Sequence, residues 1–158
     1  MIRLGYDNDS LDYIASTLWC DEDIRRSLDD DMNRPSYLVR LADMLRSGDV
    51  IAYAPVIEGE PVGMIWAMTG IDGELLTHIH IMRKAWGSTV ELALEAKSAF
   101  EAEVGCSKFV ALIPEFNRLA RSFARRVGFV ECGIADSKYT RKGVEHRCWR
   151  YELPAERS

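Results

Sequence analysis

The chain has 158 residues, of which 47% are hydrophobic and 28% charged, and its formal net charge is −5 at pH 7. This composition predicts one globular domain over residues 1–158 and excludes collagen-like, disordered and disulfide-scaffold proteins. No apolar run approaches the ~20 residues that cross a bilayer, and the acidic start carries no secretory signal, so we expect no membrane partner and a cytoplasmic location. Four cysteines without a C-x-x-C pair predict free, reduced thiols: Cys20, Cys106, Cys132 and Cys148.

Charge is unevenly distributed along the chain. Residues 1–31 hold nine acidic and three basic residues, whereas residues 117–150 hold nine basic and three acidic ones. The basic part suits an anionic ligand, but the two parts could also pair with each other within the fold or between subunits, or simply form solvated faces. The acidic net charge argues against a nucleic-acid partner.

The first half of the chain predicts two helices followed by three strands. Apolar residues recur at helical spacing after Asp9-Ser10 and again over 38–45, where Gly48 ends the pattern. Residues 50–57 and 62–68 predict an antiparallel hairpin with a turn over 58–61, and Pro55 marks a bulge or an edge. Residues 75–82 follow as a strand, with His78 and His80 on one of its faces.

The second half alternates between helices and strands. A helix is expected from Gly87 to about Val104, a strand buried on both faces over 109–113, and a helix over 117–127. We expect Leu119, Ala120, Phe123 and Val127 of this last helix to point inward, with its arginines outward. Strands over 129–132 and 144–153 complete the chain, joined by a polar loop through Tyr139 and Lys142. The order predicts a mixed sheet covered by helices.

Two segments carry a resemblance to a known family. Asn117-x-x-Ala120-x-x-Phe123, closed by Gly128-Phe129, resembles the N-x-x-A-x-x-L-Y-x-x-x-G-F segment of the GNAT superfamily of N-acetyltransferases. Residues 84–89, Lys-Ala-Trp-Gly-Ser-Thr, stand where that family has Q/R-x-x-G-x-G/A. The resemblance implies an α/β (α+β) fold of the GNAT type, a mixed and mostly antiparallel sheet of six to seven strands flanked by helices. Some compact members of this kind are encoded by bacteriophages.

The segment over 83–89 has the chemistry of a phosphate site. A loop that opens a helix presents free backbone N–H groups at the positive end of the helix dipole, which suits a pyrophosphate, although it is also an ordinary helix start. The resemblance makes acetyl-CoA the cofactor, with lysine and threonine replacing two residues of the family pattern. The expected cofactor-binding residues are Arg83, Lys84, Trp86, Gly87, Ser88, Thr89 and Asn117.

Acyl transfer to an amine needs proton transfer at both ends of the reaction. The resemblance places the family's frequent general acid, a tyrosine, at Ala124, which has no proton to give, so Tyr139 or Tyr53 would have to substitute. Glu74, His78 and His80 are the candidate bases, and the two histidines could equally be hydrogen-bonded core residues. Because His-x-His has no evident third ligand, no metal is expected. Cys106 and Cys132 have no recognisable partner as nucleophiles.

Two functions from different classes follow. The first is an acetyl-CoA-dependent N-acyltransferase that moves an acetyl group to a primary amine by direct attack in a ternary complex. The acidic N-terminal segment favours a cationic acceptor such as a polyamine, an aminoglycoside or a lysine of a protein. The second is an inactive GNAT-fold protein that binds a protein partner or assembles with itself, for example in a bacteriophage particle, and it would then lie in the virion or the host cytoplasm. Its candidate interface residues are the acids of 21–31, the arginines of 118–126, and Trp19, Trp86 and Trp149.

Overall fold

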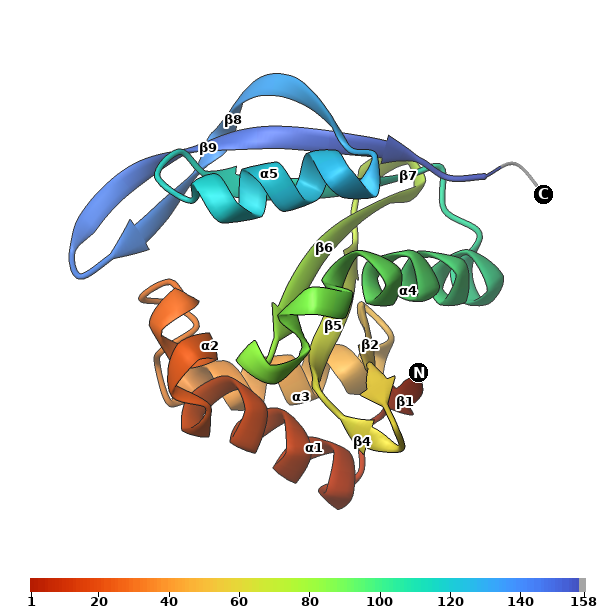
Figure 1. The fold of residues 1–158 in the computed structure, drawn as a ribbon. Coiled ribbons are helices and arrows are strands. Elements are labelled where there is room, and N and C mark those ends of the chain that lie inside the picture. The colour runs from red at the N-terminus through yellow and green to blue at the C-terminus, as the bar shows by residue number, and fades with distance from the viewer. Residues whose placement is uncertain (157–158) are drawn as a thin grey trace.

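The computed structural model describes residues 1–156. Its sheet has seven strands in the order β1-β2-β5-β6-β7-β9-β8, all antiparallel neighbours except β6 and β7 (Figure 1). The predicted class, a mixed and mostly antiparallel sheet flanked by helices, is confirmed. No helix in this part of the chain is long and apolar enough to cross a membrane. The helices and strands are β1 (Ile2–Leu4), α1 (Asn8–Ala15), η1 (Ser16–Cys20), α2 (Glu22–Ser27), α3 (Ser36–Ser47), β2 (Val50–Ala54), β3 (Val56–Ile57), β4 (Glu60–Pro61), β5 (Gly63–Thr69), η2 (Ile71–Gly73), β6 (Glu74–Ile81), η3 (Arg83–Ser88), α4 (Thr89–Val104), β7 (Lys108–Pro114), α5 (Arg118–Val127), β8 (Val130–Arg141) and β9 (Val144–Pro154).

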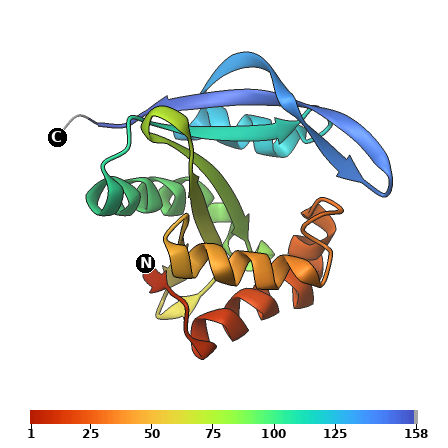
Figure 2. The same cartoon turned by 180° about the vertical axis from the view of Figure 1, so that it is seen from behind.

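Helices cover both faces of the sheet. Because side chains alternate along a strand, Ala52 and Trp66 pack against α1, α2 and α3, whereas Ile51 and Ile65 pack against α4 on the opposite face. Helix α5 packs on β7 and β9 through Ala124, on the same side as α4 (Figures 1 and 2). Two helical layers therefore enclose the strands around which the site is built.

Acidic residues of the N-terminal segment begin its helices. The Asp7 carboxylate accepts the Ser10 N–H at 2.9 Å and starts α1, and the Asp21 carboxylate accepts the Ile24 N–H at 3.0 Å and starts α2. Such caps satisfy backbone donors that a helix leaves unpaired in its first turn. A wider π turn, η1, separates the two helices, and the sequence analysis predicted neither this turn, nor helix α2, nor the short strand β1.

The C-terminal hairpin differs from the prediction. Most of the expected polar loop is strand, because β8 continues through Tyr139 to Arg141 and pairs with β9, whereas Lys142 lies in the turn. Lys142 and Gly143 both have positive φ, 51° and 74°, which is the geometry of a tight two-residue hairpin turn. The dipeptide Lys142-Gly143 between two segments of strand-like sequence was the signal for this turn.

The tip of this hairpin is fixed to the N-terminal half. The Asp30 carboxylate accepts the backbone N–H groups of Lys142 at 2.9 Å and of Gly143 at 3.0 Å. The Asp30 N–H donates to the Thr140 carbonyl at 2.8 Å. The acidic and basic parts of the chain therefore meet here, through carboxylate-to-backbone bonds.

One residue of α5 was placed on the wrong side. Leu119 is 78% exposed, whereas Ala124 and Val127 are buried as the inner stripe of the helix. At about 100° per residue, Leu119 lies about a quarter turn away from Ala120, at the margin of that stripe. Arg121 lies on the other margin and is half-buried, since it donates to the Tyr151 hydroxyl at 3.0 Å.

Candidate functional site

The two central parallel strands separate after a short paired stretch. Strands β6 and β7 pair only at Glu74–Lys108, Leu75–Phe109 and Leu76–Val110. Beyond that point β6 remains bonded to β5 as far as Ile81, and β7 remains bonded to β9 as far as Pro114. The facing edges over 77–81 and 111–114 therefore have no partner strand, and they diverge as Figure 1 shows. Backbone N–H and C=O groups at such edges need other partners.

A cavity of about 250 Å³ lies between the diverging strands. Both strands line it, and α4 and α5 form its wall on one face of the sheet. Each helix contributes small side chains there, Ala93 and Ala96 from α4, and Ala120 and Ala124 from α5. Larger residues at these positions would fill the space between the helices, so the alanines keep it open.

His78 and His80 line this cavity from β6. Both point to the face of the sheet that α1–α3 cover, where the His78 ring stacks on Trp66 with centroids 4.2 Å apart. Burial lowers the pKa of His78 to about 4, and burial together with the neighbouring His78 lowers the pKa of His80 to about 3. Both imidazoles are therefore neutral at pH 7.

The backbone at His80 is held by a glycine on the neighbouring strand. A Cβ atom at Gly63 would lie 2.2 Å from the His80 carbonyl oxygen, so no other residue fits there. The Tyr13 hydroxyl of α1 donates to the Gly63 carbonyl at 2.6 Å and so fixes the backbone of Gly63 beside His80. The buried Nε2 of His80 has no hydrogen-bond partner within the described residues.

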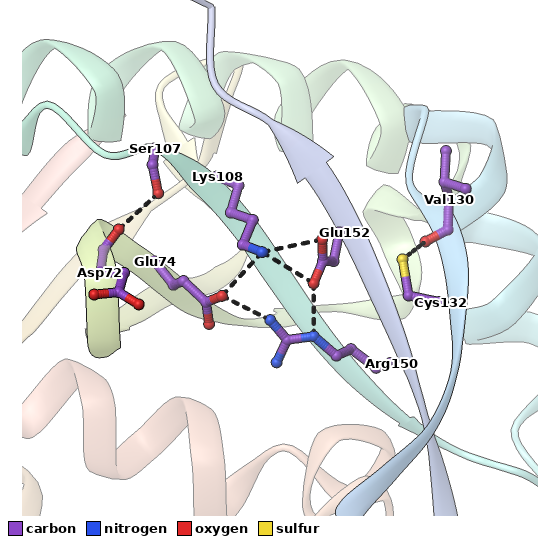
Figure 3. A network of polar contacts seen from close by, with 8 residues as sticks. All are labelled: Asp72, Glu74, Ser107, Lys108, Val130, Cys132, Arg150 and Glu152. Carbon is purple, nitrogen blue, oxygen red and sulfur yellow. Dashed lines mark hydrogen bonds and ion pairs between the residues drawn. The ribbon is translucent and has the colours of Figure 1, made fainter.

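Glu74 does not line the cavity. It lies at the paired end of β6, where its carboxylate contacts Lys108 at 3.0 Å and Arg150 at 2.8 Å (Figure 3). Glu152 completes the network with the same two cations at 3.1 and 2.7 Å. Hydrogen bonds from Arg150 and Lys108 hold the pKa of Glu74 below its ordinary value. This arrangement joins β6, β7 and β9, and Glu74 lies at the first residue of β6, four residues before His78.

The two candidate tyrosines are both engaged with other groups. The Tyr139 hydroxyl donates to the Ser27 carbonyl at 2.5 Å, and burial raises its pKa to about 12. Ser27 itself lines the cavity, so Tyr139 lies behind the wall rather than in it. The Tyr53 hydroxyl bonds to Glu103, and burial and this carboxylate raise its pKa to about 12.

The predicted phosphate loop forms the turn η3 and the start of α4. Its own contacts are local: the Trp86 indole N–H donates to the Ile81 carbonyl at 3.0 Å, and the Thr89 hydroxyl donates to the Trp86 carbonyl at 2.7 Å. No side chain caps α4, because Ser88 makes no capping hydrogen bond. A Cβ atom at Gly87 would meet nothing within 4 Å. None of the residues 83–89 lines the cavity between the strands.

Asn117 and Ala124 both line the cavity. The Asn117 side-chain oxygen accepts the Ala120 N–H at 3.0 Å and caps α5, so this residue sets where the helix begins. Ala124 is buried and presents only a methyl group. Cys106 and Cys132 lie outside the lining, and within the described residues no three His, Cys, Asp or Glu side chains gather as metal ligands.

The tryptophans considered for an interface fall into two groups. Trp19 packs against the core between α1 and α3, and its indole N–H donates to the Met32 carbonyl at 3.0 Å. Trp149 packs against Ile113 under α5. Trp86 is 50% exposed, with the Arg83 guanidinium 5.6 Å from its ring.

Several residues of the cavity were not singled out by the sequence analysis. The sequence analysis named Ala120 as an inward-facing residue and Ala124 as the position of a missing tyrosine, but the role of the four alanines as a cavity wall follows only from α4 and α5 lying side by side. Leu112 and Pro114 lay in or beside an apolar run that was read correctly as a buried strand, but its separation from β6 is a tertiary feature.

The sequence matches no protein-family model and no curated protein. Among solved structures, a spermidine N-acetyltransferase from Vibrio cholerae in complex with CoA and spermine superposes with a TM-score of 0.76 at 14% identity, covering 94% of this chain and 92% of that one. An acetyltransferase from Salmonella typhimurium that modifies the N-terminal serine of a ribosomal subunit protein superposes at 0.78 and 14% identity, covering 98% and 94%. With its sheet order and its diverging central strands, the chain has the fold of the GNAT N-acetyltransferases.

Proposed function

We propose that this protein is an acetyl-CoA-dependent N-acetyltransferase. The observation that carries the proposal is the separation of β6 from β7 with a cavity between them that both strands line. The reaction is acyl transfer: the amine nitrogen bonds to the thioester carbonyl carbon, the carbon–sulfur bond breaks, and the proton lost by the amine balances the one gained by the thiolate.

The residues present fit the pantetheine arm of acetyl-CoA. This arm is narrow and carries two amides, and the unpaired backbone edges over 77–81 and 111–114 offer N–H and C=O groups to such a ligand. The walls formed by Ala93, Ala96, Ala120 and Ala124 suit its apolar segments. Acetyl-CoA supplies an activated acetyl group when bound.

The start of α4 supports the placement of the pyrophosphate. The helix has 16 residues and no side-chain cap, and Arg83 and Lys84 begin the turn η3 that leads into it. The N-terminus of a helix binds phosphate groups favourably through its dipole and its N–H groups. Gly87 leaves open space at this point, so a phosphate can approach the backbone.

His78 and His80 are the polar side chains proposed to contact the acceptor amine. They line the cavity from the face opposite to α4 and α5, so the acceptor and the cofactor would enter from opposite faces. A neutral imidazole nitrogen such as Nε2 of His80 accepts a hydrogen bond from an amine and orients its lone pair. Ala124 supplies no proton, so the thiolate is proposed to take its proton from water.

Release of CoA thiol in the presence of a panel of primary amines, with product masses, tests this function. We expect acetyl-CoA-dependent formation of an N-acetyl product whose mass rises by one acetyl group. Absence of acetyl-CoA binding together with absence of transfer to every amine would overturn the proposal.

A further inference from the structure

The cavity lining has an unusual charge composition for a site that accepts amines. Within the described residues, no Asp or Glu lines it, and its sole cationic side chain is Lys97. Lys97 is held by Glu101 at 2.7 Å and by Glu156 at 3.3 Å, so its charge is compensated by two carboxylates that do not line the cavity. The remaining lining is apolar apart from hydroxyl, amide and imidazole groups.

The acids of the N-terminal segment do not supply the missing carboxylate. Asp21 and Asp29 accept backbone N–H groups at 3.0 and 2.7 Å, and Asp30 is bound to the hairpin turn. Around Tyr139, the charges of Asp29, Asp30 and Arg141 act from outside the cavity wall. No acid of residues 1–31 lines the cavity, so this segment places no carboxylate beside the reacting amine.

We infer, on the basis of the proposed function, that the acceptor is a weakly basic primary amine, a large fraction of which is uncharged near neutral pH. The α-amino group of a peptide and an aromatic amine are the two sources of this chemistry. Polyamines and lysine side chains are disfavoured, because an ammonium group in this cavity would lose its water without gaining a carboxylate partner.

The two histidines support this inference. To use an ammonium acceptor, a base must first remove its proton, and the pKa of a lysine-like amine is about 10.4. Imidazoles with pKa values of about 4 and about 3 hold a proton too weakly for that step. They can accept a hydrogen bond from an amine that arrives neutral, which fits the unpaired Nε2 of His80.

The expected size of the preference follows from protonation alone. At pH 7.5 about one third of an α-amino group with pKa near 7.8 is neutral, against about one part in a thousand of an amine with pKa near 10.4. The specificity constant kcat/KM should therefore favour the weakly basic amine by about 100-fold or more.

The test compares four acceptors at pH 7.5 with saturating acetyl-CoA: alanyl-alanine amide, aniline, spermidine and Nα-acetyl-lysine methylamide. We expect one or both of the first two to exceed both cationic acceptors in kcat/KM by about 100-fold. Equal or greater kcat/KM for a cationic acceptor, or acetyl-CoA binding without transfer to either weakly basic amine, would overturn the inference and leave cofactor binding intact. Loss of the proposed function would differ, since acetyl-CoA itself would then not bind.

A matched pair of variants at the cavity wall sharpens the test. Ser27 lies at the exposed end of α2 and lines the cavity, so a substitution there tolerates a new charge. Ser27→Asp adds the missing carboxylate, and Ser27→Asn adds the same shape without charge. We expect kcat/KM for spermidine to be about tenfold higher in the Ser27→Asp protein than in the Ser27→Asn protein, and kcat/KM for alanyl-alanine amide to be the same in both. An equal response of both acceptors would contradict a role for the missing carboxylate.

Discussion

Leu76 and Val110 form the last pair between β6 and β7, and the cavity begins directly beyond them. Each strand continues for several residues, supported on its outer edge by β5 or β9. The outer pairing keeps two unpaired edges rigid and facing each other. A ligand with its own amide groups can thus complete the hydrogen bonding of a preformed site.

Filling the space between α4 and α5 should block acetyl-CoA. Ala124 is buried and lines the cavity, so Ala124→Leu places three more carbon atoms inside it. We expect the Kd for acetyl-CoA to rise more than tenfold, while Tm changes by less than about 5 °C because the added carbons occupy existing space. Calorimetric titration and thermal melting measure the two effects.

Ala102→Leu is the matched control, since it makes the same change on the exposed side of α4. It should leave the Kd unchanged. Tight binding by the Ala124→Leu protein would show that the cofactor lies elsewhere.

Stability should depend on pH through the buried histidines. The pKa of His78 is about 4 in the folded protein and about 6.5 when unfolded, so the unfolded chain binds more protons between these values. The contribution of His78 to the free energy of unfolding should therefore be largest above pH 6.5, and the free energy of unfolding should fall as the pH decreases toward 4. His78→Phe keeps a ring against Trp66 and removes the titration. The Tm of the His78→Phe protein should fall less than that of the wild type as the pH decreases from 7 to 5. Parallel curves of Tm against pH for the two proteins would contradict a role for His78 in this pH dependence.

Glu74 should matter for stability and not for catalysis. Glu74→Gln removes the negative charge between Lys108 and Arg150 but keeps its shape. We expect a small decrease of Tm that disappears in 1 M salt, since partly exposed ion pairs are weak and screened. The rate of acetyl transfer should be unchanged, and a loss of kcat without a loss of Tm would restore Glu74 as a candidate base.

Asp30 should hold the hairpin tip. Backbone N–H donation from Gly143 and Lys142 lowers the pKa of its carboxyl group, so the bonds persist until the pH falls below the ordinary carboxyl range. Asp30→Asn removes the charge and one acceptor oxygen. Hydrogen exchange at the Lys142 and Gly143 amides should accelerate. Asp31→Asn is the control: the Asp31 carboxylate pairs with Arg34, so its loss should leave exchange at these two amides unchanged. Equal exchange in both variants would exclude this role for Asp30.

Local patterns in the sequence predicted most of the fold. The 3.6-residue spacing of apolar residues predicted helix α4, and the continuous apolar run predicted strand β7. Helix α3 ends at Gly48, as expected. The π turn after α1 and the extension of β8 were missed, because contacts from distant segments decide them. The Tyr139 bond to Ser27 spans 112 residues of sequence and cannot be read from local spacing.

The site was predicted only in part for the same reason. His78 and His80 were placed correctly on one strand face, but the sequence could not show that Glu74, four residues earlier, pairs with Arg150. Residue types indicated possible chemistry at each position. The divergence of two strands determined which of these residues share a cavity.

Calorimetric titration with acetyl-CoA tests the central claim most directly, with Gly87→Trp as the probe. Gly87 has open space around it, so the indole should leave the fold intact and obstruct a phosphate at the start of α4. Leu94→Trp, on the exposed side of the same helix, is the control. The account predicts micromolar binding by the wild type and by Leu94→Trp, and loss of binding by Gly87→Trp. Equal binding by all three proteins would contradict the proposed pyrophosphate position, and absence of binding by the wild type at millimolar acetyl-CoA would contradict the proposed function.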